Sequence, residues 1–194
     1  MLLFSNTKRR ESPQAALFLD RDGVINRDHG YVHSKENFDF LPGIFKLALD
    51  ARASGYLCVV VTNQAGIGRG LYTTNQFKTL SIWMCEQFQN KGAFIDAIYY
   101  SPFHPTEARG RYLLKETTRK PGAGMFLEAA LELNIDLSKS IMIGDKISDV
   151  EASANASITS NYLLSSSGIN LPQSLKGKVE MVSDLPAIVA RLQW

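Results

Sequence analysis

Four groups of polar residues in this sequence carry side chains that could act on a phosphate ester. Three of the groups directly follow apolar segments, and one precedes a predicted helix. A loop carboxylate taken alone is more often a helix cap or a solvated group, but four groups at such positions favour a shared site. The residues concerned are Asp20 with Asp22, Thr62 with Asn63 and Gln64, Arg119 with Lys120, and Asp145 with Asp149.

Hydrolysis of a phosphate ester needs a nucleophile, a proton donor for the leaving alkoxide and positive groups for the developing charge. Asp20 could attack phosphorus and form an aspartyl-phosphate. Asp22, two residues further on, could protonate the leaving group and then activate water. Thr62 and Lys120 could hydrogen-bond the transferring phosphoryl oxygens. We therefore expect Asp20, Asp22, Thr62 and Lys120 to be the catalytic set.

The same carboxylates predict a Mg²⁺ site. Asp20 and Asp145, with the backbone carbonyl of Asp22 and water, would supply the hard oxygen ligands that Mg²⁺ prefers. Lys146 could take part through its backbone or from outside the ligand shell. Asp149 could orient Lys120 or the metal waters, or it could simply cap the following helix.

Strands that alternate with helices along the chain predict a Rossmann-like, doubly wound α/β fold with a mainly parallel sheet, as a single domain over residues 1–194. In such sheets the ligand crevice lies beyond the carboxyl ends of the strands, where the polar groups fall. Residues 1–13 look like a polar lead-in, and residues 24–41 and 101–118 look like long loops. The expected strands are 15–19, 57–62, 95–100, 140–144, 159–164 and 179–182, and the expected helices are 42–55, one following Thr73, 124–133, 149–154 and 186–192. The helix at 124–133 should bury Phe126, Leu127, Ala130 and Leu131.

Composition narrows the functional class. The 21 basic and 19 acidic residues give a net charge of +2 and no basic footprint for nucleic acid. Cys58 and Cys85 lie in apolar segments and favour a reducing compartment, and the longest apolar stretches are too short for a membrane span. We expect a cytoplasmic monomer that acts on a small molecule.

The motifs resemble those of the haloacid dehalogenase (HAD) superfamily. They occur in the family's order, as Asp20-x-Asp22-Gly23, Thr62-Asn63, Lys120 and Gly144-Asp145-x-x-x-Asp149. Segments 28–33, 61–70, 99–102 and 119–121 further resemble the D-glycero-D-manno-heptose 1,7-bisphosphate phosphatases and their histidinol-phosphatase relatives. The resemblance covers about residues 18–182 and implies a capless, Mg²⁺-dependent phosphatase that removes the C7 phosphate of the sugar.

The resemblance also implies a set of substrate-binding residues: Asn26, Arg27, Asp28, His29, Thr62, Asn63, Gln64, Ala65, Arg119 and Lys120. A bisphosphate carries a second dianion, which Arg69, Arg119, Arg109 or Arg111 could grip through paired donors. His29 and His33 could bind sugar hydroxyls, or they could be surface groups. The alternatives are a histidinol-phosphate or other sugar-phosphate phosphatase, and a catalytically silent binding protein on the same scaffold.

The sequence departs from the family pattern in the loop at 101–118. Members of the family usually carry zinc-binding cysteines there, whereas this chain has Ser101, Phe103, Glu116 and Thr118. His104 alone could not hold a structural zinc ion, which takes four ligands, so we predict none. Packing must then order the loop, or it stays mobile until substrate arrives. The packing candidates are Phe103, Tyr112, Leu113 and Leu114.

Overall fold

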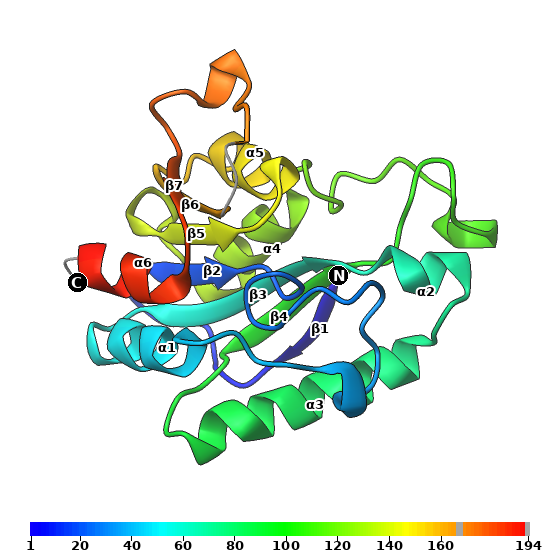
Figure 1. Cartoon of the computed structure of the whole chain (residues 1–194), viewed down its shortest axis with the longest axis horizontal. Coiled ribbons are helices and arrows are strands. Elements are labelled where there is room, and N and C mark those ends of the chain that lie inside the picture. Colours follow the sequence, from blue (N-terminus) through cyan, green and yellow to red (C-terminus); the bar gives the residue numbers. More distant parts are fainter. Residues whose placement is uncertain (166–168, 193–194) are drawn as a thin grey trace.

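The computed structural model describes residues 1–165 and 169–192 and joins its strands in one seven-stranded sheet (Figure 1). The strand order is β1-β4-β3-β2-β5-β6-β7, with β1 antiparallel to β4 and every other pair parallel. This confirms the doubly wound, mainly parallel α/β class. The strands are β1 (Leu2–Ser5), β2 (Ala16–Leu19), β3 (Leu57–Asn63), β4 (Ala97–Ser101), β5 (Ile141–Gly144), β6 (Ser160–Leu164) and β7 (Glu180–Val182).

Strand β2 lies near the middle of the sheet, paired with β3 on one side and β5 on the other. Its four residues are all apolar and fully buried, as expected for a parallel strand covered on both faces. The chain runs from β2 to β3 and β4 on one side and to β5 and β6 on the other. This reversal opens a crevice beyond the carboxyl end of β2, where Asp20 follows the strand.

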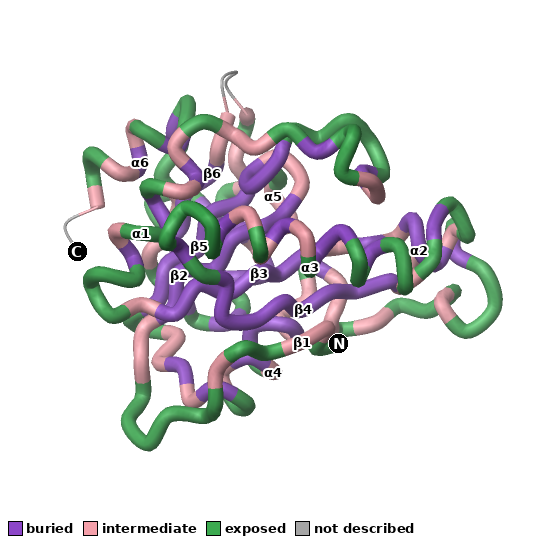
Figure 2. The backbone as a smooth tube through the Cα atoms, turned by 90° about the horizontal axis from the view of Figure 1, so that it is seen from below, coloured by how far each residue is buried: buried purple, intermediate pink, exposed green. Residues whose placement is uncertain are grey.

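Helices cover both faces of the sheet, and the buried strands run between them (Figures 1 and 2). One face carries α1 (Ile44–Ala53), α3 (Thr74–Asn90) and α6 (Leu185–Arg191), and the other carries α4 (Gly124–Leu133) and α5 (Ile147–Asn155). The short helix α2 (Ala65–Arg69) follows β3, and 3-10 turns span Lys35–Asn37, Gly110–Tyr112, Leu137–Lys139 and Gln173–Leu175. Within the described residues, no helix is both long and apolar enough to span a membrane.

Two local features differ from the sequence-based expectation. Residues 2–5 form the edge strand β1, because backbone pairing with β4 can order a short, half-exposed segment that has no apolar alternation of its own. On helix α4, Phe126 is buried as expected, but Leu127 and Leu131 are 53% and 75% exposed, and Met125 and Ala129 are buried instead. This helix carries apolar side chains on most of its circumference, so their spacing does not define one face.

Candidate active site

A cavity of about 580 Å³ opens at the carboxyl ends of the central strands. A second cavity, of about 660 Å³, is lined by Arg10, Arg52 and Asp96 and contains none of the predicted site residues. The predicted site residues that line the first cavity are Asp20, Asp22, Asp28, Thr62, Asn63, Ala65, Arg69, Arg119, Lys120, Lys146 and Asp149. Its lining does not include Asn26, Arg27, His29, Gln64 or Asp145.

Lys120 joins the ends of two strands at the wall of the cavity. Its ammonium group is buried and donates hydrogen bonds to Asp20 Oδ1 at 2.9 Å and to the carbonyl of Val61 at 2.8 Å. It also lies 2.8 Å from Asp149 Oδ1. Burial alone would lower the pKa of Lys120, but the charges of Asp149 and Asp20 hold it above its ordinary value. Lys120 is therefore a fixed cation beside Asp20.

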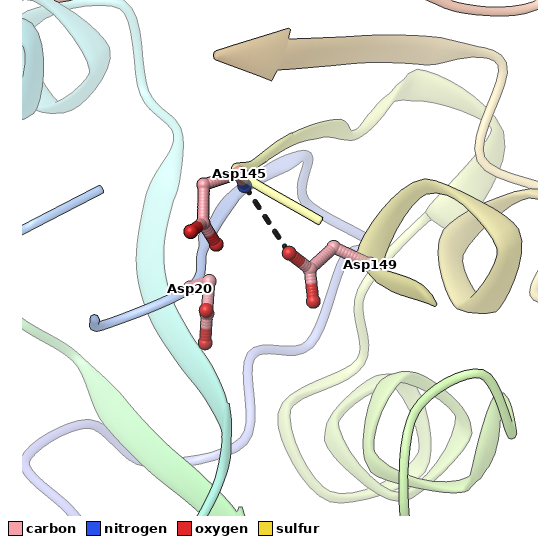
Figure 3. Close-up of side chains that lie close together, drawn as sticks. All are labelled: Asp20, Asp145 and Asp149. Atoms are coloured by element: carbon pink, nitrogen blue, oxygen red, sulfur yellow. Dashed lines mark hydrogen bonds between the residues drawn. The ribbon is translucent and has the colours of Figure 1, made fainter. Parts of the chain in front are cut away.

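Asp149 performs both of the tasks considered for it. Its side chain accepts a hydrogen bond from the backbone amide of Asp145 at 3.2 Å (Figure 3). It also accepts one from the amide of Lys146 at 2.9 Å at the start of α5, and it pairs with Lys120. A Cβ atom on Gly144 would lie 2.3 Å from the Cβ of Asp149. Glycine at position 144 is therefore what allows Asp149 to sit against the end of β5.

Three carboxylates form one cluster beside Lys120 (Figure 3). Ligand atoms of Asp20, Asp145 and Asp149 all lie within 4.8 Å of one another. Burial raises the pKa of Asp20 to about 6 against the opposing charge of Lys120, and burial with the charges of Asp20 and Asp149 raises the pKa of Asp145 to about 8. Asp145 Oδ1 is buried without a hydrogen-bond partner. Of the three carboxylates, Lys120 contacts only Asp20 and Asp149, so the orphaned oxygen of Asp145 and the remaining negative charge fit a hard divalent cation such as Mg²⁺.

Asp22 is held differently from Asp20. Arg21 is almost fully buried and grips the Asp22 carboxylate through its Nε and Nη2 atoms, at 3.1 and 2.6 Å. Asn26 donates to the same carboxylate at 3.0 Å and Gln64 at 3.2 Å. Arg21 was not singled out from the sequence, since a buried arginine depends on contacts made by distant segments. The only feature of the sequence that points to a role for Arg21 is its position between Asp20 and Asp22.

The last residues of β3 and Gln64 after it support the site. Asn63 exchanges two hydrogen bonds with the backbone of Lys120, at 3.0 and 3.1 Å, and so fixes the position of Lys120 relative to the end of β3. Thr62 is buried at the strand end, and its hydroxyl accepts a hydrogen bond from Gln64 at 2.9 Å. Gln64 is buried, as is Asn26, which donates to Asp22 and to the carbonyl of Arg27.

Charged residues surround the mouth of the cavity. Lys146 pairs with Asp28 at 3.0 Å, whereas His29 pairs with Asp39 at 2.7 Å outside the cavity lining. Arg69 and Arg119 both line the cavity, and Arg69 pairs with Glu107. The cavity-lining residues do not include Arg109 or Arg111, which were considered for the second phosphate.

Contacts with α2 order the loop at 101–118. The amide of Arg109 donates to the carbonyl of Gly68 at 2.8 Å, and a Cβ atom on Gly68 would lie 2.3 Å from the carbonyl oxygen of Pro102. The rings of Phe103 and Tyr112 pack edge to face at 5.9 Å. Leu113 and Leu114, the other packing candidates, are each 49% exposed. Backbone contacts, one aromatic pair and the ion pair between Arg69 and Glu107 hold the loop.

Comparisons with known proteins agree with the motifs and the fold. Residues 117–189 match the family model described as HAD-hydrolase-like. A Burkholderia mallei D-glycero-alpha-D-manno-heptose-1,7-bisphosphate 7-phosphatase is 52% identical over 149 residues, which cover 77% of this chain and 79% of that protein. The beta-anomer enzyme of Pasteurella multocida is 42% identical over 92% of this chain and 98% of that protein.

A solved structure gives the same result. The D,D-heptose 1,7-bisphosphate phosphatase of B. bronchiseptica, complexed with magnesium and phosphate, superimposes with a TM-score of 0.78 at 27% identity. The match covers 92% of this chain and 97% of that one. With the sequence relatives, it confirms the predicted family. This chain belongs to the D-glycero-D-manno-heptose-1,7-bisphosphate 7-phosphatases, a family of phosphoric monoester hydrolases within the HAD superfamily.

Proposed function

We propose that this protein hydrolyses the C7 phosphate of D-glycero-D-manno-heptose 1,7-bisphosphate, with Asp20 as the nucleophile and Mg²⁺ as the cofactor. The observation that carries this proposal is the position of Lys120, whose ammonium group bridges Asp20 and Asp149 at the cavity wall. The printed names of the relatives supply the substrate.

Asp20 is suited to attack phosphorus because one of its oxygens is anchored by Lys120 and the carboxylate lines the cavity. The attack forms an aspartyl-phosphate and releases the sugar alkoxide, which Asp22 protonates before it activates water for the second step. Thr62 donates a hydrogen bond to the transferring phosphoryl group, and the fixed positive charge of Lys120 stabilises the negative charge that develops there. Asp149 keeps Lys120 in place.

Asp20 and Asp145 are the residues best placed to hold Mg²⁺, because both oxygens of Asp149 already have partners in Lys120 and the backbone amides. Gly23, with a φ of 91°, runs so close to Asp145 that a Cβ atom there would lie 2.2 Å from Oδ2. The backbone after Asp22 therefore lies beside Asp145, which supports a ligand role for the Asp22 carbonyl. When bound, the cation neutralises the anionic nucleophile and phosphoryl oxygens.

Arg69 and Arg119 are the residues that we assign to the second phosphate. Both line the cavity, and each guanidinium can offer paired donors to a phosphate dianion. A volume of about 580 Å³ falls within the usual range for small-ligand sites. Asp28, Asn63 and Ala65 also line the cavity and are the remaining candidates for contacts with the sugar.

We further propose that the protein works in the cytoplasm as a monomer and without structural zinc. Free thiols at Cys58 and Cys85 support a reducing compartment. The contacts between α2 and the loop at 101–118 support an order that needs no metal. Metal analysis of the purified protein tests the last point, and stoichiometric zinc would contradict it.

Release of phosphate with Mg²⁺ tests the function. The panel contains both anomers of heptose 1,7-bisphosphate, fructose 1,6-bisphosphate and histidinol phosphate. We expect a heptose anomer to give the highest kcat/KM and Asp20→Asn to abolish turnover. Asp50→Asn, which alters a surface ion pair on α1, is the matched control. Equal rates for wild type and Asp20→Asn would refute the mechanism, and a preference for histidinol phosphate would refute the substrate.

A further inference from the structure

A tyrosine absent from the four motifs connects to two candidate catalytic residues through one side chain. Tyr72 lies just after α2, is 5% exposed and lines the cavity. Its hydroxyl donates a hydrogen bond of 2.6 Å to Gln64 Oε1. Gln64 Nε2 in turn donates to Thr62 Oγ1 at 2.9 Å and to Asp22 Oδ2 at 3.2 Å. Gln64 itself is buried and faces these partners rather than the cavity.

The chemistry of the partners fixes which way the Gln64 amide points. An ionised Asp22 carboxylate can only accept hydrogen bonds, so the end of the amide that faces it must be the donor Nε2. Oε1 then faces Tyr72 and needs a donor there. The Tyr72 hydroxyl supplies it. Without that hydroxyl, Oε1 would be a buried acceptor with no partner, and the amide would lose the contact that favours this orientation.

The Tyr72 ring is itself held on two sides by its surroundings. A Cβ atom on Gly66 would lie 2.2 Å from Cε1 of the ring, so glycine at this position lets the ring approach α2. The His33 imidazole stacks on the ring with centroids 5.2 Å apart and an interplanar angle of 6°. The hydroxyl is thus presented from a fixed ring, and a loss of the hydroxyl alone leaves this packing in place.

We propose that Tyr72 is a positioning residue that acts through Gln64 to hold the Asp22 carboxyl group in one orientation. From this orientation the protonated form of Asp22 gives its proton to the leaving group and becomes the carboxylate. The inference rests on the proposed role of Asp22. Arg21 and Asn26 still grip Asp22 when Gln64 turns away, so the effect is partial. Gln64 then supports Asp22 and Thr62 through hydrogen bonds and does not bind the substrate.

Substituted phenyl phosphates provide the test, because their rings have nearly the same size while their leaving groups differ in basicity. A basic phenoxide needs protonation as it departs, and an acidic p-nitrophenoxide does not. For Tyr72→Phe we expect kcat/KM to fall about tenfold with phenyl phosphate, well within the about 10²- to 10⁴-fold contribution of general acid catalysis. With p-nitrophenyl phosphate we expect less than about a twofold change.

Two controls separate positioning from a general structural effect. Tyr99→Phe also removes a hydroxyl from a buried ring, one bonded to Glu132 at 2.7 Å outside the cavity lining. It should leave both rates unchanged. Asp22→Asn should steepen the dependence on leaving-group basicity more than Tyr72→Phe does. If Asp22→Asn does not steepen it, the role of Asp22 itself is wrong, and the inference about Tyr72 is refuted with it.

A double-mutant cycle on heptose 1,7-bisphosphate completes the test. If Tyr72 acts through Asp22, adding Tyr72→Phe to Asp22→Asn should lower kcat/KM by less than about twofold. A second double-mutant cycle combines Tyr72→Phe with Gln64→Met, and the two losses in kcat/KM should again not add. A uniform fall across all phenyl phosphates, no fall at all, or full additivity in either cycle would overturn the proposal.

Discussion

The inner cluster, which consists of Lys120 and the carboxylates of Asp20, Asp145 and Asp149, is rich in charge, and so is the loop at 101–118. The two regions are built in different ways. The inner cluster is buried, and Lys120 contacts two carboxylates at 2.9 and 2.8 Å. The ion pair that links the loop to α2, between Arg69 and Glu107, leaves Glu107 54% exposed. A buried charge is costly when its partner is removed, whereas an exposed pair contributes little. Stability should therefore depend more on the buried pairs of Lys120 than on the pair between Arg69 and Glu107.

The largest effect should follow the loss of the buried cation. Lys120→Met leaves Asp20 and Asp149 buried without their shared partner, so we expect a loss of about 3–5 kcal/mol in the free energy of unfolding and a fall in kcat of at least about 10²-fold. Urea unfolding and steady-state kinetics measure these changes. Lys139→Met, which removes an exposed pair with Asp136, should cost less than about 1 kcal/mol. Similar losses in the free energy of unfolding for Lys120→Met and Lys139→Met would contradict the difference between buried and exposed pairs.

The rim arginines should affect binding without affecting chemistry. Arg69→Ala removes one charged contact to the second phosphate, worth about 1.5–3 kcal/mol, so KM for the bisphosphate should rise about 10- to 100-fold with kcat unchanged. Arg111→Ala is the control, because Arg111 does not line the cavity. A fall in kcat for Arg69→Ala at constant KM would place Arg69 among the catalytic groups instead.

Removal of the metal should expose the carboxylate cluster. In the metal-free protein, the raised pKa values of Asp20, about 6, and Asp145, about 8, mean that the folded state keeps protons which the unfolded chain has lost. The stability contributed by these groups therefore falls as pH rises from about 4 to about 8. Tm measured with EDTA should show this fall, and Asp145→Asn should reduce it.

Addition of Mg²⁺ should oppose the same trend. A Mg²⁺ concentration of about 100 times Kd adds about 2.7 kcal/mol to the free energy of unfolding. At a fixed Mg²⁺ concentration the gain should be larger at the upper end of the pH range, because the ligands must be ionised and Kd is then lower. Calorimetry at several pH values measures the gain. A stabilisation that does not depend on pH, or that persists in Asp145→Asn, would contradict the assignment of the cation to this cluster.

The smallest effect should come from the pair between the loop and α2. Glu107→Gln removes an exposed partner of Arg69, so the free energy of unfolding should change by less than about 1 kcal/mol. Turnover of p-nitrophenyl phosphate should stay unchanged, since Glu107 touches no member of the inner cluster. Thermal unfolding and that assay check both points. A large loss of stability or of p-nitrophenyl phosphate turnover would show that the loop and the inner cluster are one cooperative unit.

The contrast between the two regions also explains what the sequence predicted. Parallel strands place the residues that follow them at one edge of the sheet, so the convergence of Asp20 and Asp145 could be anticipated. Which way a side chain turns at that edge depends on partners from distant segments. Gln64 turns inward because Tyr72 and Asp22 meet it there, and no local pattern reveals this.

The same limit applies away from the site. Strand β1 forms because β4 offers a free edge, and its apolar run from Leu2 to Phe4 is too short to predict a strand by itself. The buried face of α4 is predicted only in part, because neighbouring apolar positions on that helix differ only in what packs against them. Long-range contacts decide these details, whereas continuous apolar strands and turn positions decide the fold.

Identification of the phosphorylated residue tests the central claim most directly. The protein is mixed with heptose 1,7-bisphosphate and Mg²⁺, quenched in acid within a single turnover, digested and analysed by mass spectrometry. We predict one phosphoryl group on the peptide that contains Asp20, and none in Asp20→Asn. A phosphoryl group on any other residue, or full turnover with no phosphorylated enzyme at any quench time, would contradict the account.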